Sequence, residues 1–167
     1  FLPLLPSPYT YPMSRQVLGF VGPACPYKVR KIWNELLARE GIDGFFDGYR
    51  ATKAADVEQR LSEMYLLVRR VYVIGKGLAG DSASMMDRLD LSAVSALAVD
   101  TVVNDGGVFT GYHIGDVLDT RIDENLADVL GSIVGRLKPG ADALNLLLGN
   151  RRSVQVEHSV WRTHPFH

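Results

Sequence analysis

The chain has 167 residues, of which 47% are hydrophobic and 22% charged, a composition typical of a globular domain and unlike a collagen-like or wholly disordered chain. Its 18 basic and 19 acidic side chains nearly balance, so it lacks the basic surface that tracks a phosphate backbone, and we expect no nucleic-acid partner. The single cysteine, Cys25, excludes an internal disulfide and a multi-cysteine metal site. A lone cysteine suits a reducing compartment, so we expect a cytoplasmic protein. We also expect no metal site.

Residues 1–15 are predicted to be a disordered extension. They contain Pro3, Pro6, Pro8 and Pro12, which fix the backbone angle φ and remove hydrogen-bond donors, so neither a signal-type helix nor a membrane span forms there. No other segment has the ~18 uninterrupted apolar residues that a membrane helix needs. We therefore expect no membrane partner.

Two strand, helix, strand units follow this extension. Residues 16–21 are predicted to form a buried strand, residues 29–37 carry apolar side chains at helical spacing, and residues 45–51 are typical of a second strand. Residues 57–68 predict another amphipathic helix, and residues 71–74 predict a third strand. Strands joined by helices pair in parallel through right-handed crossovers. The predicted fold class is therefore α/β, a mostly parallel sheet flanked by helices in three layers.

A β-hairpin is predicted after a short helix around residues 85–89. Residues 98–103 and 108–112 resemble two strands, and Asn104-Asp105-Gly106-Gly107 separates them. Asn, Asp and Gly tolerate the positive φ values of a tight turn. We place this antiparallel hairpin at one edge of the sheet.

The last part of the chain is predicted to be less regular. Residues 126–137 give a clear amphipathic helix, which Pro139-Gly140 would end, and residues 141–148 are open to either strand or helix. The predicted division of the chain is an extension (1–15), a substrate-binding domain (16–121), a helical C-terminal segment (122–150) and a flexible tail (151–167).

Three segments, in order, resemble successive motifs of shikimate dehydrogenases. They are Val71-Tyr72-Val73-Ile74-Gly75-Lys76, then Ala98-Val99-Asp100-Thr101 before the hairpin, then Gly111-Tyr112-His113-Ile114-Gly115-Asp116. The corresponding family motifs are Val-Thr-Val-Pro-His-Lys, Ala-Val-Asn-Thr and a strand ending Asn-Thr-Asp. The resemblance spans about residues 16–118, and it implies the substrate-binding half of such an enzyme.

The resemblance implies NADP-linked interconversion of 3-dehydroshikimate and shikimate, a step of the chorismate pathway of aromatic amino acid biosynthesis. In such enzymes a lysine and an aspartate face the reacting hydroxyl, which implies catalytic roles for Lys76 and Asp116. Removing a hydride from a secondary alcohol requires that the hydroxyl proton leave too, so an acceptor must lie about 2.6 to 3.2 Å from that oxygen. The alternative roles are a solvated loop residue for Lys76 and a cap or turn residue for Asp116.

Several pocket positions depart from the family pattern, and they supply the substrate-binding candidates. The family's serine pair is missing after the first strand, where Tyr27 could donate a hydrogen bond or simply lie in a solvated helical turn. Asp100 replaces an asparagine and can only accept when ionised, whereas Thr101 matches the family. His113 could bind substrate or carry a proton, or it could be structural. Asp116 comes one residue late, so it reaches the lysine only if the strand bulges or has ended.

A nucleotide-binding loop is an alternative interpretation of residues 75–80. Gly75, Gly77 and Gly80 fit G-x-G-x-x-G directly after a predicted strand, where backbone amides at a helix N-terminus can hold a pyrophosphate. The hairpin directly after Asp100 conflicts with the helical crossover that a dinucleotide fold needs next.

The resemblance places the NADP-binding domain after the substrate-binding domain. Only 51 residues follow Asp116, and none of them forms a Gly-x-Gly, so we do not expect this chain alone to bind NADP. The expectation is a truncated dehydrogenase that binds a small hydroxy acid such as shikimate or quinate, and whose second domain could come from a partner chain. A non-catalytic binding or remnant domain is the alternative. Catalytic activity and assembly as a homodimer stay open.

Overall fold

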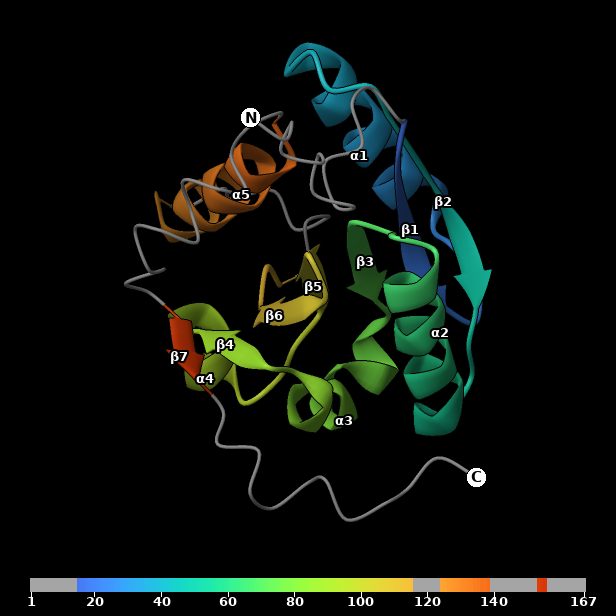
Figure 1. Cartoon of the computed structure of the whole chain (residues 1–167), viewed down its shortest axis with the longest axis vertical. Coiled ribbons are helices and arrows are strands. Elements are labelled where there is room, and N and C mark those ends of the chain that lie inside the picture. The colour runs from blue at the N-terminus through green and yellow to red at the C-terminus, as the bar shows by residue number, and fades with distance from the viewer. Residues whose placement is uncertain (1–14, 116–123, 139–152, 156–167) are drawn as a thin grey trace, which may run out of the picture.

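The computed structural model describes residues 15–115, 124–138 and 153–155. Within these ranges, seven strands form one sheet in the order β2-β1-β3-β5-β6-β4-β7 (Figure 1). The strands are β1 (Gln16–Gly22), β2 (Gly44–Arg50), β3 (Val71–Ile74), β4 (Arg88–Asp90), β5 (Thr101–Asp105), β6 (Val108–Tyr112) and β7 (Ser153–Gln155). β1, β2, β3, β4 and β6 share one direction, whereas β5 and β7 run opposite to their neighbours.

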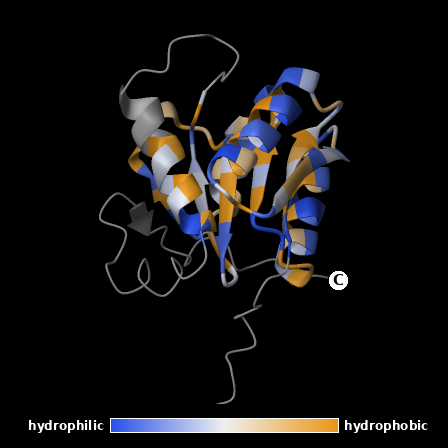
Figure 2. Cartoon of the chain, turned by 90° about the horizontal axis from the view of Figure 1, so that it is seen from above, coloured by the Kyte–Doolittle hydropathy of each residue, from blue (hydrophilic) through white to orange (hydrophobic). Residues whose placement is uncertain are grey.

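Helices flank both faces of this sheet, which confirms the α/β class and the three layers. They are α1 (Tyr27–Arg39), α2 (Ala54–Leu66), α3 (Ala79–Ser82), α4 (Leu91–Ala96) and α5 (Glu124–Leu137), with 3₁₀ turns η1 (Lys76–Leu78) and η2 (Ala83–Met85). Apolar residues of α1 and α5 pack on one face, and those of α2, α4 and η1 pack on the other. In Figure 2 the sheet in the middle is largely hydrophobic, and polar residues lie on the outer sides of the helices.

The first strand and helix illustrate why the predicted elements form. Leu18 and Phe20 of β1 point to the α1 face and Val21 to the opposite face, as the two-residue period of a strand requires. Trp33 of α1 is 2% exposed and stacks on Phe46 of β2, with ring centroids 5.6 Å apart. The helix ends before Gly41, whose φ of 67° is the left-handed conformation that glycine adopts readily. The predictions for β1, α1, β2, α2, β3 and α5 are confirmed.

The hairpin is confirmed, but its predicted place at the sheet edge is wrong. β5 and β6 pair from Thr101↔Tyr112 to Asp105↔Val108, around a turn in which Gly106 and Gly107 have φ values of 60° and 94°. β4 covers the outer side of β6 in parallel, and β7 pairs with β4. The hairpin therefore lies inside the sheet.

The short helix predicted around residues 85–89 is also wrong. Helical turns occupy residues 76–85, and Arg88–Asp90 is strand β4. The Asp87 N–H donates to the Phe109 carbonyl at 2.9 Å, and the Asp87 carboxylate accepts the Phe109 N–H at 2.8 Å. These contacts with β6 outweigh the weak local helical preference of the segment.

The described part of the C-terminal region adds one helix and one short strand. The helix α5 buries Val129, Ile133, Val134 and Leu137 in the same core as β1 and α1. Ser153–Gln155, within the predicted flexible tail, forms strand β7. Residues 1–14, 116–123, 139–152 and 156–167 lie outside the described residues, and they include parts of all four predicted regions. No helix within the described ranges is long and apolar enough to cross a membrane.

Candidate functional site

The carboxyl ends of β1, β3 and β6 meet beside the start of β5. The Gly75 N–H donates to the Val21 carbonyl at 2.8 Å, the Ile74 N–H to the Asp100 carbonyl at 2.6 Å, and the Asp100 N–H to the Tyr112 carbonyl at 3.0 Å. In open α/β sheets, ligands bind outside the carboxyl ends of the strands. We call this end of the sheet, with residues 75–76, 100–101 and 113–115, the carboxyl edge.

Lys76 is the first residue of η1, directly beyond β3. Its side chain is exposed, and it makes no side-chain hydrogen bond or ion pair with any other described residue. Its ammonium group is therefore available to a ligand at the carboxyl edge. Asp116, the other predicted catalytic residue, lies outside the described residues, so the predicted Lys76–Asp116 pair stays a prediction.

Asp100 is buried at the carboxyl edge, with 8% of its surface exposed. Its Oδ1 accepts the Ile114 N–H and its Oδ2 the Gly115 N–H, both at 2.8 Å. The Thr101 hydroxyl donates to Oδ1 at 3.1 Å, and Thr101 itself is fully buried. Desolvation raises the pKa of the Asp100 carboxyl above its ordinary value, although these hydrogen bonds and His113 act in the opposite direction. Asp100 is acceptor-only when ionised, and in this structure it organises the chain after β6.

His113 follows β6 and lies beside Asp100. Its Nδ1 is 3.4 Å from Asp100 Oδ2, and 35% of its side chain is exposed. Its backbone N–H donates to the Ser92 hydroxyl of α4 at 3.0 Å. Sequence reasoning named both residues but missed their contact. A two-residue turn at Gly106-Gly107 fixes a register in which Asp100 faces His113, so the hairpin signal itself could have revealed the pair.

Tyr27 begins α1 in the segment after β1. Its side chain is 69% exposed, and the Arg30 guanidinium lies 6.0 Å from its ring centroid. Cys25 lies in the same loop, where its Cβ would be 2.7 Å from a Cβ added to Gly48 of β2. Burial raises the pKa of the Cys25 thiol. This loop is therefore anchored at Cys25, whereas the phenol of Tyr27 extends into solvent.

The glycines of residues 75–80 do not form a close-fitting phosphate loop. Gly75 precedes a 3₁₀ turn, and the helix after it, α3, has only four residues. None of the three candidate glycines has a positive φ, and a Cβ added to Gly77 or Gly80 would meet no atom within 4 Å. The loop thus lacks the long helix and the close backbone approach that dinucleotide binding uses. Within the described residues, no cluster of side chains could hold a metal ion.

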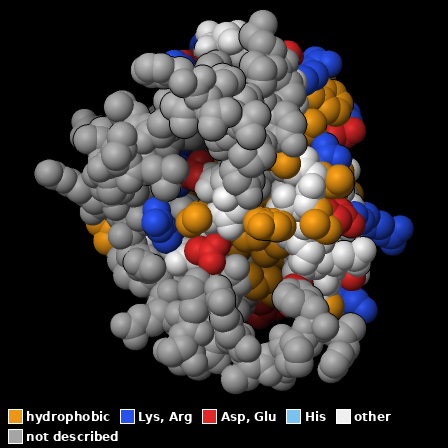
Figure 3. Space-filling model, in the orientation of Figure 1, with side chains coloured by type: hydrophobic (Ala, Val, Ile, Leu, Met, Phe, Trp, Pro, Cys, Tyr) orange, Lys and Arg blue, Asp and Glu red, His pale blue; other side chains and the backbone are white. Residues whose placement is uncertain are grey.

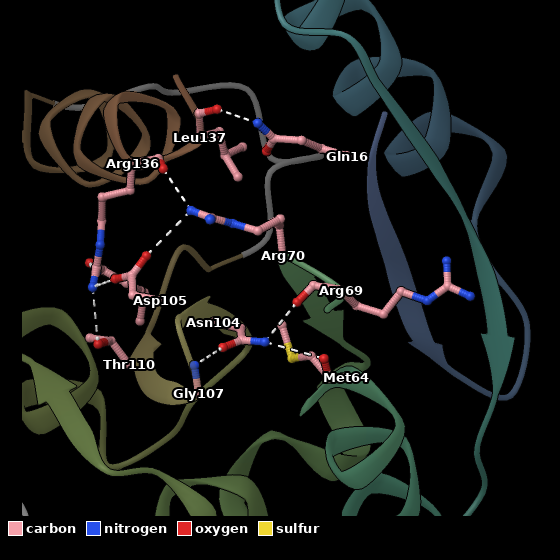
Figure 4. A network of polar contacts seen from close by, with 11 residues as sticks. Gln16, Met64, Arg69, Arg70, Asn104, Asp105, Gly107, Thr110, Arg136 and Leu137 are labelled. Atoms are coloured by element: carbon pink, nitrogen blue, oxygen red, sulfur yellow. Dashed lines mark hydrogen bonds and ion pairs between the residues drawn. The ribbon is translucent and has the colours of Figure 1, made fainter. Parts of the chain in front are cut away.

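A second polar cluster, at the opposite end of the sheet, was missed by sequence reasoning (Figure 4). Arg136 of α5 is 6% exposed and contacts the Asp105 carboxylate and the Tyr112 hydroxyl. The Arg70 guanidinium lies 3.4 Å from Asp105 and donates to the Arg136 carbonyl at 2.7 Å. These contacts join α5, β3 and the hairpin. We call Arg70, Asp105 and Arg136 the arginine cluster.

No protein-family model matches this chain, and its sequence matches no curated protein. Solved structures do share its fold. A shikimate 5-dehydrogenase from Listeria monocytogenes, in complex with shikimate and NAD, is 22% identical with a TM-score of 0.52, covering 59% of this chain and 34% of that one. A shikimate 5-dehydrogenase from Thermus thermophilus, in complex with shikimate, is 18% identical with a TM-score of 0.54, covering 59% and 38%.

A 5-ketofructose reductase of Gluconobacter sp. strain CHM43 is also similar. It is 12% identical with a TM-score of 0.56, and the match covers 62% of this chain and 37% of that one. At such identities the likeness establishes the fold alone. The matched part spans little more than a third of each of these proteins.

Proposed function

We propose that the carboxyl edge binds a small hydroxylated carboxylic acid such as shikimate or quinate, as the substrate-binding half of a shikimate dehydrogenase-like oxidoreductase. The observation that carries the proposal is that Asp100 and His113 lie together beside the carboxyl ends of β3 and β6, and that Lys76 follows β3 two residues after its end. It is supported by the shared fold with enzymes that were crystallised with shikimate. The ligand class is chosen because such acids present both a carboxylate and several hydroxyl groups.

Lys76 supplies the charge that this ligand class needs. Its ammonium group is exposed and has no ion-pair partner among the described residues. An ammonium donates hydrogen bonds to a carboxylate or a hydroxyl, and a lysine close to a reacting hydroxyl can also exchange a proton with it. Tyr27, at the start of α1, is proposed to offer its exposed hydroxyl group to the ligand. Thr101 is proposed to act indirectly, because its buried hydroxyl group donates a hydrogen bond to Asp100.

The oxidoreductase part of the proposal requires NADP, which would accept the hydride. Among the described residues, the loop with Gly75, Gly77 and Gly80 does not fit that cofactor, because it leads into a four-residue helix. We therefore assign NADP binding to a separate nucleotide-binding domain. A catalytic pair of Lys76 with Asp116 is part of the proposal on the strength of the motif resemblance alone.

Titration calorimetry of the whole chain with shikimate and quinate tests the proposal. We expect saturable binding, and we expect Lys76→Met to weaken it at least about tenfold, the factor that 1.4 kcal/mol represents. Lys138→Met is the matched control, because Lys138 pairs with Glu40, which follows the end of α1, well away from the carboxyl edge. Binding of neither acid, or equal losses in both variants, would contradict the proposal.

A further inference from the structure

The strongest feature beyond this proposal is the Asp100–His113 pair. The Asp100 carboxylate is held on both oxygens, by Ile114 N–H and Gly115 N–H at 2.8 Å each, and the Thr101 hydroxyl adds a third hydrogen bond. A carboxylate fixed in this way cannot turn away from its neighbours. His113 is thus beside an acceptor of defined position.

The two ring nitrogens of His113 have different environments. Nδ1 is buried and lies 3.4 Å from Asp100 Oδ2, and it makes no hydrogen bond within the described part of the chain. A buried polar atom without a partner is unfavourable, so the ring gains most when Nδ1 carries the proton and directs it at the carboxylate. The exposed 35% of the side chain therefore excludes Nδ1 and belongs to the rest of the ring.

This arrangement fixes the chemistry of the other nitrogen. In a neutral imidazole one nitrogen donates and the other accepts, and a carboxylate beside Nδ1 selects the tautomer in which Nε2 accepts. Asp100 then acts as an orienting group, which is a common role for a carboxylate beside a functional histidine. The contact between Nδ1 and the carboxylate is long for a hydrogen bond, as such contacts often are before a ligand binds.

We infer that His113 Nε2 is a proton-accepting atom of the carboxyl edge in addition to Lys76, with Asp100 as its positioning residue. Nε2 accepts a hydrogen bond from a hydroxyl of the ligand, and it can take that proton when the ring becomes charged beside the Asp100 carboxylate. The inference rests on the proposed function for its ligand class. It deepens that proposal by naming an atom that accepts the hydrogen bond of a ligand hydroxyl.

The tautomer of His113 tests the geometry without any ligand. The chain has 4 histidines, and two-bond nitrogen–proton NMR correlations of the free protein distinguish their Nδ1–H and Nε2–H tautomers. The signal absent from His113→Gln identifies His113. We expect the Nδ1–H tautomer at pH 8, and we expect Asp100→Asn to lose this preference because an amide can donate as well as accept. An Nε2–H tautomer in the unsubstituted protein would overturn the inference.

Ligand binding tests the role of Nε2. We expect His113→Phe, which keeps a planar ring and removes both nitrogens, to weaken shikimate binding at least tenfold. His113→Gln should recover part of the loss, because its amide oxygen can accept a hydrogen bond. Equal affinity in all three proteins overturns the inference. If the unsubstituted protein shows the Nδ1–H tautomer but binds neither shikimate nor quinate, the pair stands as inferred and the proposed ligand class fails.

Discussion

Strand β5 has a largely buried carboxylate at each end, and the two carboxylates have different partners. Asp105, its last residue, faces two guanidinium groups, those of Arg70 and Arg136. Asp100, directly before its first residue, faces two backbone N–H groups, one hydroxyl and the imidazole of His113. Asp105 therefore faces permanent cations. Asp100 is instead surrounded by hydrogen-bond donors and the imidazole of His113.

The comparison separates a structural end of the sheet from the end at which we propose ligand binding. The guanidiniums at Asp105 stay charged at any accessible pH, and they tie α5 to the hairpin, so this cluster has no part free to react. At Asp100 a buried carboxylate lies beside a partly exposed imidazole, which is the pair to which we assign proton exchange with a ligand. On the face of the molecule drawn in Figure 3, hydrophobic side chains lie beside charged ones, as on an ordinary protein surface.

Substitution of Asp105 gives the largest expected effect. Asp105→Asn removes the negative charge that faces Arg70 and Arg136, whose side chains are only 15% and 6% exposed. Removing one partner of a buried ion pair lowers the free energy of unfolding by about 3 to 5 kcal/mol. Urea unfolding followed by circular dichroism measures the loss.

The control for this prediction is Asp43→Asn. Asp43 pairs with Arg15 at 3.4 Å, but both side chains are largely exposed, so the loss should stay below about 1 kcal/mol. Similar losses in the two variants would mean that the arginine cluster does not lock α5.

The hairpin turn directly follows Asp105, sets the register that brings Asp100 opposite His113, and gives the next largest effect. Gly107 has a φ of 94°, and a Cβ added there would lie 2.7 Å from the Tyr65 ring. Gly107→Ala should therefore reduce the free energy of unfolding by about 1 to 3 kcal/mol, through backbone strain and overpacking. Gly77→Ala is the matched control, because its Cβ would meet nothing within 4 Å and its φ is not positive. Chemical unfolding of both variants checks the difference, and equal stabilities would show that the turn tolerates a side chain.

The fold was largely predictable because its signals are local. The apolar run of Val71 to Ile74 and the turn residues 104–107 specify a strand and a hairpin from neighbouring residues alone. β4 was not predictable in this way. Its three residues become a strand only because β6 offers a partner to Asp87 and Arg88.

The polar sites show the same limit. Arg70 meets the Arg136 carbonyl across 66 positions, and Arg136 meets Asp105 across 31, so neither contact has a local signature. Lys76 and Asp100 were found through the motif resemblance, but the partners of Asp100 depend on the path of the chain after β6. The Asp100–His113 contact is intermediate, because the hairpin register alone brings the two residues opposite each other.

The pH dependence of stability distinguishes the Asp100 end in a third experiment. The folded-state pKa of Asp100 lies above its unfolded value of 3.8, so the folded state binds the proton more tightly. The penalty for burying the charge is present above the folded pKa, and it disappears as the pH falls through that value toward 3.8. Relative to Asp100→Asn, the unsubstituted protein should therefore gain stability on acidification in this window. Urea unfolding of both proteins between about pH 7 and about pH 4 measures the two free energies of unfolding. If the unsubstituted protein stays constant or loses stability relative to Asp100→Asn on acidification, the assignment is contradicted.

Lys76 gives the smallest expected effect on stability and so tests the proposed ligand-binding end most directly. Its side chain is exposed and forms no ion pair with a described residue, whereas Arg136 is 6% exposed and bound to Asp105. Lys76→Met should change the free energy of unfolding by less than about 0.5 kcal/mol, as surface substitutions usually do. The same variant is expected to lose ligand affinity, so stability and binding are separated in one protein. A large loss of stability would mean that Lys76 supports the fold. An ammonium group whose role is to bind a ligand should contribute little to the free energy of unfolding while the ligand is absent.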